Sequence, residues 1–577
     1  MIRLPTLLVT TLACSLLLSP HAAQAAITGQ VIDQLSGLPV EGARVRIQAT
    51  LDEPVLTDAD GRFTLASPPP GSSVITAVTT YDPNRAINYI IGSASAVDGD
   101  DISIDLTRLP DADLPTPYEP GSSFVCSACH ADQHNEWQQS THSNAGLNEW
   151  VLDLYSGTGT PGGSNGYVFR DSHDSDDTGF CATCHTPLAD MQDPGNVFMD
   201  EVTLVGGLDG VTCLACHQMA DVNDNVSALH HLGNSDYRYP DDFATPFWVW
   251  GPLDDVSFST MRASYQPKFS QARFCASCHE YNNPDTGAPG QNTYTEWLAS
   301  PFAVEGPDFM ACQDCHMPAA DKPGPISSLG GQPIRPASQR RSHTFTGSTQ
   351  TTLTGAMELA LDVAQVGDEL VVRADVTNAG AGHHFPTGIS IRNALLVIEA
   401  SVDGSTLDQS GGGVIPFYGS ASGGMSPDDL AGQPGKGFAR VLEGRINGQG
   451  PVVRPVLFID AEGVTSDTRI PSGVTDSSEY RFDLSTLEEN ANAEVSARLL
   501  YRRAWRDTQV SKGWTTTPTG NPIEVEVGSQ RITLGVIGAP PQQTFPVPSL
   551  QLGSLLALML SLLLIALSLQ RLEAKRG

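Results

Sequence analysis

Five copies of one pentapeptide lie between residues 126 and 316, and they constrain this chain more than any other feature of its sequence. Each copy has two cysteines, two residues apart, with a histidine directly after the second: Cys126-Ser-Ala-Cys129-His130, Cys181-Ala-Thr-Cys184-His185, Cys213-Leu-Ala-Cys216-His217, Cys275-Ala-Ser-Cys278-His279 and Cys312-Gln-Asp-Cys315-His316. Zinc ribbons and disulfide frameworks also use paired cysteines, but neither requires a histidine after every pair. The pattern is the attachment signature of c-type haem, in which both thiols bond to the porphyrin and the histidine binds the iron.

We therefore expect five covalently bound haem c groups. The covalent sites are Cys126, Cys129, Cys181, Cys184, Cys213, Cys216, Cys275, Cys278, Cys312 and Cys315, and the proximal iron ligands are His130, His185, His217, His279 and His316. Of eleven cysteines only Cys14 lies outside the motifs, so none is left for a structural disulfide in the mature chain. The 65 acidic residues against 32 basic residues exclude nucleic acid as a partner, because a phosphate backbone needs a basic face. This acidity favours solubility outside the cytoplasm over steering of a basic redox partner.

Both ends of the chain carry targeting features. Residues 1–25 read as a secretory signal, with Arg3, a short leucine-rich core and the small-residue site Ala23-Gln-Ala25. Residues 539–549 form a Pro-rich linker, and residues 550–570 contain an uncharged apolar run long enough to span a bilayer. Basic residues follow this run, which favours a cytoplasmic tail if the helix is kept. A transmembrane anchor and a cleaved sorting signal both fit, and we expect an exported protein in the periplasm or on the cell surface.

Residues 26–109 predict a small β-sandwich. The segments Ile27–Asp33 and Ala43–Ala49 alternate apolar and polar side chains, as half-buried strands do. The pattern of Gly, Asp, Pro and Val residues from Gly29 to Phe63 resembles the carboxypeptidase regulatory-like domain, which implies a transthyretin-type fold and no particular chemistry. Residues 110–121, rich in Pro and Asp, are expected to be a linker.

Residues 122–347 are expected to form the pentahaem domain, with short helices and loops packed around the porphyrins. A duplication is visible, because residues 180–185 match 274–279 and residues 211–219 match 310–318. We interpret this as a two-haem unit, formed by the second and third motifs and repeated by the fourth and fifth, with the Cys126 motif in front. Residues 348–538 return to strand-like runs and predict a second β-sandwich. The whole is a multidomain chain, with β-rich domains on both sides of a haem-packed domain.

A second axial ligand on each iron decides between electron transfer and catalysis. Three histidines lie in segments that resemble those of cytochrome c-554-like multihaem proteins: Trp137-Gln-Gln-Ser140-Thr-His142, Ser342-His343-Thr-Phe345-Thr-Gly347 and Gly382-His383-His384-Phe385-Pro-Thr-Gly388. The resemblance implies that His142, His343 and His383 are distal ligands, with His383 reaching a haem from the β-domain.

The remaining distal candidates are less well defined. One of the adjacent His230 and His231 is a candidate, and so is His173, which lies among acidic residues. His134 shares a helix face with His130 and suits a neighbouring haem or a propionate. Phe302 stands where His142 stands in the otherwise similar segment Glu136–His142, so one haem is either ligated from elsewhere or five-coordinate.

These features predict an exported, membrane-associated pentahaem cytochrome c. It would carry electrons in respiration or to extracellular acceptors, and its partners would be other cytochromes or a membrane quinol-oxidising complex. The alternative is a multihaem oxidoreductase that acts on a small nitrogen or sulfur compound at an open haem. A filament-forming cytochrome is a third reading, and the sequence does not indicate the oligomeric state.

Overall fold

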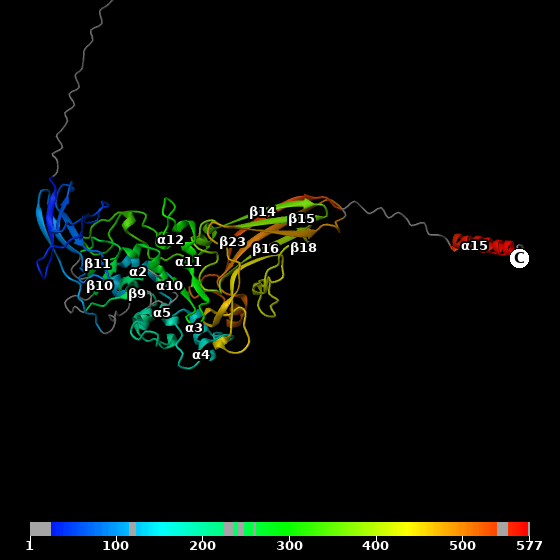
Figure 1. Ribbon diagram of the computed structural model, residues 1–577, viewed down its shortest axis with the longest axis horizontal. Helices are drawn as coiled ribbons and strands as arrows, with labels where there is room; N and C mark the ends of the chain where they lie inside the picture. The colour runs from blue at the N-terminus through cyan, green and yellow to red at the C-terminus, as the bar shows by residue number, and fades with distance from the viewer. Residues whose placement is uncertain are drawn as a thin grey trace, which may run out of the picture.

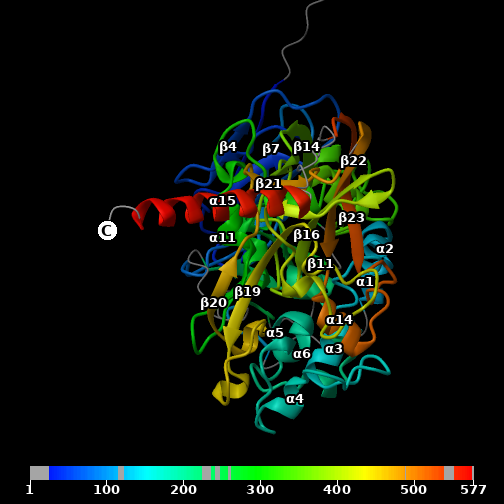
Figure 2. The same cartoon turned by 90° about the vertical axis from the view of Figure 1, so that its right-hand side faces the viewer.

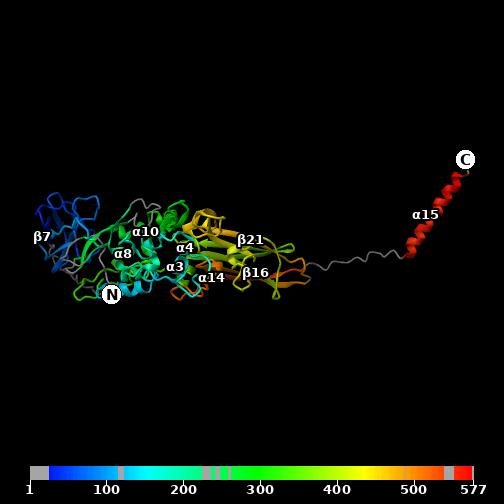
Figure 3. The same ribbon diagram turned by 90° about the horizontal axis from the view of Figure 1, so that it is seen from below.

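The structure is a computed structural model that describes residues 25–114, 123–223, 235–240, 247–257, 261–487, 489–538 and 552–574. An N-terminal β-rich part, a central part with all five motifs and a C-terminal β-rich part follow one another along the long axis (Figures 1 and 3). This arrangement confirms the expected order of β-rich regions around a centre of short helices.

The N-terminal part consists of two small sheets. The first has the order β4 (Arg62–Leu65), β1 (Ile27–Asp33), β7 (Asp101–Leu106), and the second has the order β3 (Val55–Leu56), β2 (Arg44–Ile47), β5 (Ser73–Val78), β6 (Gly92–Ala96). In β1 every second residue is buried, as the alternating sequence predicts. Residues of both sheets, among them Val31, Val45 and Ile75, share one apolar core.

The central part is made of short elements. Its described helices are α1 (Phe124–Ser127), α2 (Ala131–Gln138), α3 (Glu149–Tyr155), α4 (Phe169–Ser172), α5 (Cys181–His185), α6 (Pro187–Asp190), η1 (Met199–Glu201), α7 (Val205–Leu208), α8 (Cys213–His217), η2 (Pro267–Ser270), α10 (Arg273–His279), α11 (Thr293–Leu298), η3 (Pro301–Ala303), α12 (Cys312–His316) and η4 (Ala337–Gln339). The next helix, α13 (Gln350–Ala356), packs on the C-terminal part. Two-stranded ladders join β8 (Met219–Val222) to β9 (Ser235–Tyr237), β10 (Phe247–Gly251) to β11 (Met261–Tyr265) and β12 (Glu280–Asn282) to β13 (Pro289–Asn292). In the described residues around the motifs, apolar side chains form only small separate clusters.

The C-terminal part has two larger sheets, whose strands face the viewer in Figure 2. One has the order β14 (Met357–Val366), β15 (Glu369–Asn378), β21 (Thr475–Asp483), β18 (Gln409–Gly411). The other has the order β20 (Ala461–Asp467), β19 (Gly435–Gly444), β16 (Asn393–Val402), β22 (Ala491–Arg502), β23 (Glu524–Val536), with β17 (Ser405–Thr406) paired to β16. Their inner faces form one apolar core, to which β15, β16 and β22 each contribute. The short helices of this part are η5 (Phe417–Gly419), η6 (Ile446–Gly448), η7 (Phe458–Asp460) and α14 (Arg506–Lys512).

The last helix, α15 (Leu552–Glu573), is set apart from these domains (Figure 1). Its window Leu555–Leu572 has a mean hydropathy of 2.1, and none of that window is buried. By length and composition it is able to cross a membrane.

Candidate haem centres

Each motif lies on or beside a short helical turn, and this places its reactive side chains on one face. The helices α5, α8, α10 and α12 cover their pentapeptides completely, whereas α1 covers only the first two residues of the first motif. Helix positions i, i+3 and i+4 share a face. The two thiols and the histidine of a motif therefore point to the same side. This suits a porphyrin that is bonded to both thiols and whose iron is bound by the histidine.

The five motif histidines are oriented through the ring nitrogen Nδ1. Four of these nitrogens lie next to a backbone carbonyl oxygen: His130 next to Ile326 at 2.9 Å, His185 next to Ala145 at 3.2 Å, His217 next to Trp250 at 2.8 Å and His316 next to Thr346 at 2.5 Å. The fifth, in His279, lies 2.8 Å from the side-chain amide of Gln291. A carbonyl only accepts, so in His130, His185, His217 and His316 Nδ1 carries the proton and Nε2 keeps its lone pair for a metal.

Burial favours the neutral, metal-binding form of three of these imidazoles. It lowers the pKa of His217 to about 4 and that of His279 to about 3, and it also lowers the pKa of His185. A protonated imidazole has no lone pair for iron, so a depressed pKa favours ligation at neutral pH.

Two distal candidates face motif histidines at the separation that one iron requires. The ring centroids of His142 and His279 are 6.3 Å apart, and those of His316 and His383 are 6.5 Å apart with nearly parallel planes. With a metal–nitrogen bond of about 2.0–2.1 Å on each side, two imidazole centroids lie roughly 6.2–6.5 Å apart. Both pairs therefore fit a bis-histidine haem iron.

The ring of His383 is held in the orientation that this pairing needs. Its Nδ1 donates to the carbonyl of His384 at 3.0 Å, which leaves the lone pair of Nε2 free for a metal. Burial lowers the pKa of His383, and that of His142 to about 4. The position of His383 agrees with the expected reach from the C-terminal β-rich part to a haem site.

His343 lies near two motif histidines. Its Nδ1 donates to the carbonyl of Arg341 at 3.1 Å, and its pKa is lowered by burial and further by the charge of His130. The charge of His343 in turn lowers the pKa of His217. The described contacts thus place His343 close to the first and third motifs.

The structure places His173 in contacts between the central and C-terminal parts. Its Nδ1 lies 3.2 Å from the carbonyl oxygen of Phe169, and its Nε2 lies 3.0 Å from Asp460 Oδ1. Tyr167 donates to the other oxygen of the same carboxylate. Both ring nitrogens are engaged, so these contacts do not support the prediction that His173 is a distal ligand. The candidates His230 and His231 lie outside the described residues.

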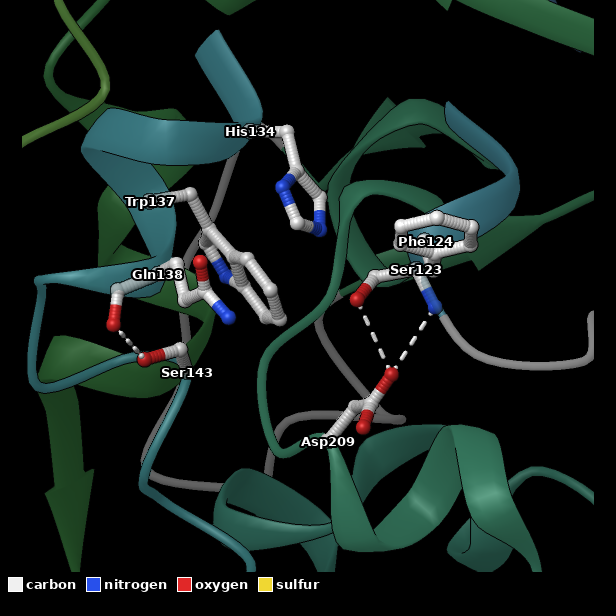
Figure 4. A pocket seen from close by; sticks show the side chains of 7 residues that line it. All are labelled: Ser123, Phe124, His134, Trp137, Gln138, Ser143 and Asp209. Carbon is white, nitrogen blue, oxygen red and sulfur yellow. Dashed lines mark hydrogen bonds between the residues drawn. The ribbon is translucent and has the colours of Figure 1, made fainter. Parts of the chain in front are cut away.

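His134 lies in a small pocket beside the first motif. The pocket has a volume of about 200 Å³ and is lined by Ser123, Phe124, His134, Trp137, Gln138, Ser143 and Asp209. Figure 4 shows the imidazole between the rings of Phe124 and Trp137, and the Asp209 carboxylate accepting from the backbone and hydroxyl of Ser123. No motif histidine lines this pocket.

Matching contacts show that the central part contains an internal repeat. The indole of Trp137 donates to the carbonyl of Val211 at 2.8 Å, and the indole of Trp297 donates to that of Met310 at 2.9 Å. Each acceptor lies two residues before a motif, the third in one case and the fifth in the other.

The same repeat makes His142 and Phe302 equivalent. The amide of Val211 donates to the carbonyl of His142 at 3.0 Å, and the amide of Met310 donates to that of Phe302 at 3.0 Å. Their backbones are held alike, but only His142 faces a motif histidine. Among the described residues, Phe302 makes no ring contact with a histidine, and it lies beside Gly382.

Contacts between thiols correct the predicted duplication. Cys126 shares a hydrogen bond with Cys213, and Cys275 shares one with Cys312. The third motif therefore pairs with the first, just as the fifth pairs with the fourth. The similarity of residues 180–185 to 274–279 is local to the pentapeptide, whereas the Glu-Trp-x-x-Ser echo after the first and fourth motifs indicates the true correspondence.

The N-terminal domain contacts the third motif through one tryptophan. Trp250 provides the carbonyl that orients His217, and Tyr81 packs edge-on against its ring at 5.7 Å. In the same interface, Asp254 of the central part forms ion pairs with Arg44 and Arg46, both from β2 of the N-terminal part. The sequence contained no signal for these contacts, because they join residues far apart in the chain.

Two segments of the chain match known family models. Residues 26–98 match the carboxypeptidase regulatory-like domain, and residues 125–218 match cytochrome c554 and c-prime. No curated protein matches the chain.

Comparison with solved structures extends the fold assignment. A penta-heme cytochrome c552 from Thermochromatium tepidum aligns with a TM-score of 0.50 and 19% sequence identity, covering 72% of this chain and 100% of its own. The structure of AvmM, which catalyses macrocyclization in alchivemycin A biosynthesis, aligns with a TM-score of 0.15 and 12% identity over 32% of this chain and 92% of its own. The chain therefore carries a carboxypeptidase regulatory-like domain at residues 26–98 and, at residues 125–218, a segment of the cytochrome c554 and c-prime family, which supports haem c as its cofactor.

Proposed function

We propose that this protein is an exported pentahaem cytochrome c that transfers electrons between redox partners and does no substrate chemistry of its own. The observation that carries the proposal is the spacing of two histidine pairs, His142 with His279 and His316 with His383. Two strong axial ligands keep small substrates off an iron and suit electron transfer. Bound haem supplies the one-electron redox chemistry.

The chain's own groups hold and order the five sites. Carbonyl and amide partners orient the proximal imidazoles, and burial lowers the pKa of three of them, His185, His217 and His279. The interactions of Cys126 with Cys213 and of Cys275 with Cys312 support a first site beside the third and a fourth site beside the fifth. Cys216 acts electrostatically on Cys275, which supports a close approach of the third and fourth sites as well. A continuous row of neighbouring sites is the arrangement expected of an electron carrier.

We assign His343 to the third site. The repeat supports this choice, because the third and fifth motifs are equivalent and each of them then takes its ligand from a His-x-Phe segment. The first and second sites, at His130 and His185, have no imidazole at ligand spacing among the described residues. His230 and His231 are our candidates for them, and the two are adjacent, so one ring at most is expected to face a given iron.

The repeat also explains Phe302 without an open haem. His142 belongs to the first pair of sites and reaches the fourth site, which lies in the second pair. Phe302 stands at the same place in the second pair, and no Cys-x-x-Cys-His motif follows the fifth motif in the sequence. A histidine there would have no iron to bind, so Phe302 does not support the oxidoreductase alternative.

We propose further that α15 anchors the protein in the membrane, with the basic residues after it in the cytoplasm and the domains outside. The helix is long and apolar enough, and the basic end fits the positive-inside rule. Measuring the mass of the mature protein tests this, because a cleaved sorting signal would remove the helix.

Haem quantitation and low-temperature magnetic circular dichroism test the main proposal. We expect five haem c per chain and oxidised spectra that are low-spin throughout and do not change when cyanide or nitric oxide is added. A high-spin iron that binds nitric oxide would refute the electron-carrier proposal and favour the oxidoreductase.

A further inference from the structure

A buried carboxylate holds the loop that carries His383. Glu296 lies on α11, and 5% of it is exposed. Its Oε2 accepts from the backbone amide of His384 at 3.2 Å and from the hydroxyl of Thr387 at 2.6 Å. These contacts fix the residue directly after the ligand, and so they fix the backbone from which the His383 ring projects.

The other oxygen of this carboxylate is bound by the C-terminal β-rich part. Arg469 donates to Glu296 Oε1 at 2.5 Å, and Arg440 of β19 lies 3.6 Å from the same atom. Arg469 also binds Asp467 through two nitrogens, at 2.8 Å each. A buried carboxylate is costly unless it is paired and hydrogen-bonded, and the two arginines supply that pairing for Glu296.

The first half of the repeat has a matching carboxylate without the arginines. Glu136 stands where Glu296 stands, and its Oε2 accepts from the backbone amide of His343 at 2.7 Å. Glu136 is half-buried, and no ion pair to it is found in the described part of the chain. Both carboxylates hold a His-x-Phe segment, but only Glu296 is linked by charge to another domain.

We propose that Glu296 is a positioning residue for the distal ligand His383, and that Arg469 makes this positioning depend on the docked C-terminal β-rich part. The inference rests on the proposed ligation of the fifth site by His383 and adds what controls it. Groups that hold a metal ligand in place typically change metal affinity by about 10- to 100-fold when they are removed. Loosening the loop would therefore release the distal imidazole of one iron.

The test compares Glu296→Ala with Glu136→Ala in the full-length, haem-loaded protein. The readout is the rate at which cyanide replaces a distal ligand, with magnetic circular dichroism to identify the affected haem. We expect Glu296→Ala to accelerate cyanide binding by roughly 10- to 100-fold at one haem, the haem that His383→Ala opens. Arg469→Met should act at the same haem, and Glu136→Ala at a different one. In a His383→Ala background, Glu296→Ala should add nothing.

The outcomes separate this inference from the proposed function. If His383→Ala opens one haem but Glu296→Ala binds cyanide at the wild-type rate, the positioning role is wrong and the ligation stands. If His383→Ala opens no haem, the ligation itself is wrong. If Glu296→Ala does not fold, Glu296→Gln keeps the size and one acceptor. Losing the negative charge should then raise the reduction potential of one haem, and an unchanged potential overturns the inference.

Discussion

Asp255 belongs to the haem region and contacts the N-terminal domain, and we expect it to hold the two together. Its Oδ1 binds Arg335 at 2.8 Å, and both side chains are 1% exposed. Its Oδ2 accepts from the backbone amide of Ala49 at 2.6 Å, in the loop after β2. Ala49 has a φ of 62°, in the left-handed region that costs a non-glycine residue free energy, so the carboxylate also stabilises that turn.

Asp255→Ala should release the N-terminal domain. Asp255 and Arg335 both belong to the central part, so loss of their buried ion pair costs that part about 3–5 kcal/mol. The side-chain bond that crosses the junction is the charge-assisted hydrogen bond from Ala49, and we expect the free energy that holds the two parts together to fall by about 1.5–3 kcal/mol when it is lost. At about 1.4 kcal/mol for each factor of ten, this increases the open population about ten- to a hundredfold.

Hydrogen exchange across the junction measures this effect. The amide of Tyr81 donates to the carbonyl of Tyr265, and the amide of Ile91 donates to that of Ala263, so both amides report on docking. We expect their exchange to accelerate about ten- to a hundredfold, with unchanged rates in β16 as the internal control. An acceleration below about fivefold, or an equal one in β16, would contradict this role of Asp255. The double variant Asp255→Leu with Arg335→Met should recover the stability of the central part, because no unpaired charge is left, but not the protection of the two junction amides, because the bond to Ala49 is still missing.

Three further substitutions test the assignment of the histidines. His142→Ala should convert one haem to high spin, at the site of His279, and an unchanged magnetic circular dichroism spectrum would show that the pair does not share an iron. Phe302→His should leave every haem unchanged, because no third pair of motifs follows the pair to which Phe302 belongs. A new low-spin signal would contradict the repeat. His173→Phe should keep all axial ligands but lower the free energy of unfolding by about 1–3 kcal/mol, since the buried Asp460 loses a partner. Calorimetry measures the stability, and magnetic circular dichroism measures the axial ligation.

The sequence predicted the parts of the fold that depend on local pattern. The strand at Ile27–Asp33 follows from alternation, and its buried residues alternate as expected. The proximal histidines follow from the pentapeptide, because thiols and imidazole share one turn. The break into short helices was also predictable, since the central part has little apolar periodicity.

What the sequence did not show depends on contacts between distant segments. His142 and His279 face each other only after the chain has folded, so no spacing rule pairs them. His173 resembles the other candidates in sequence, and no local pattern indicates its contact with Asp460. The identical residues around the second and fourth motifs favour a repeat that begins at the second motif, whereas the tryptophan hydrogen bonds match the Glu-Trp-x-x-Ser segments after the first and fourth motifs. The role of Glu296 has no local signature at all.

A cryo-EM or crystal structure of the haem-loaded protein would show directly whether imidazoles from separate domains share one iron, His316 from the central part and His383 from the C-terminal β-rich part. We expect an iron within about 2.0–2.1 Å of Nε2 in both rings. An iron at this site with His383 turned away, and water or another side chain in its place, would contradict it.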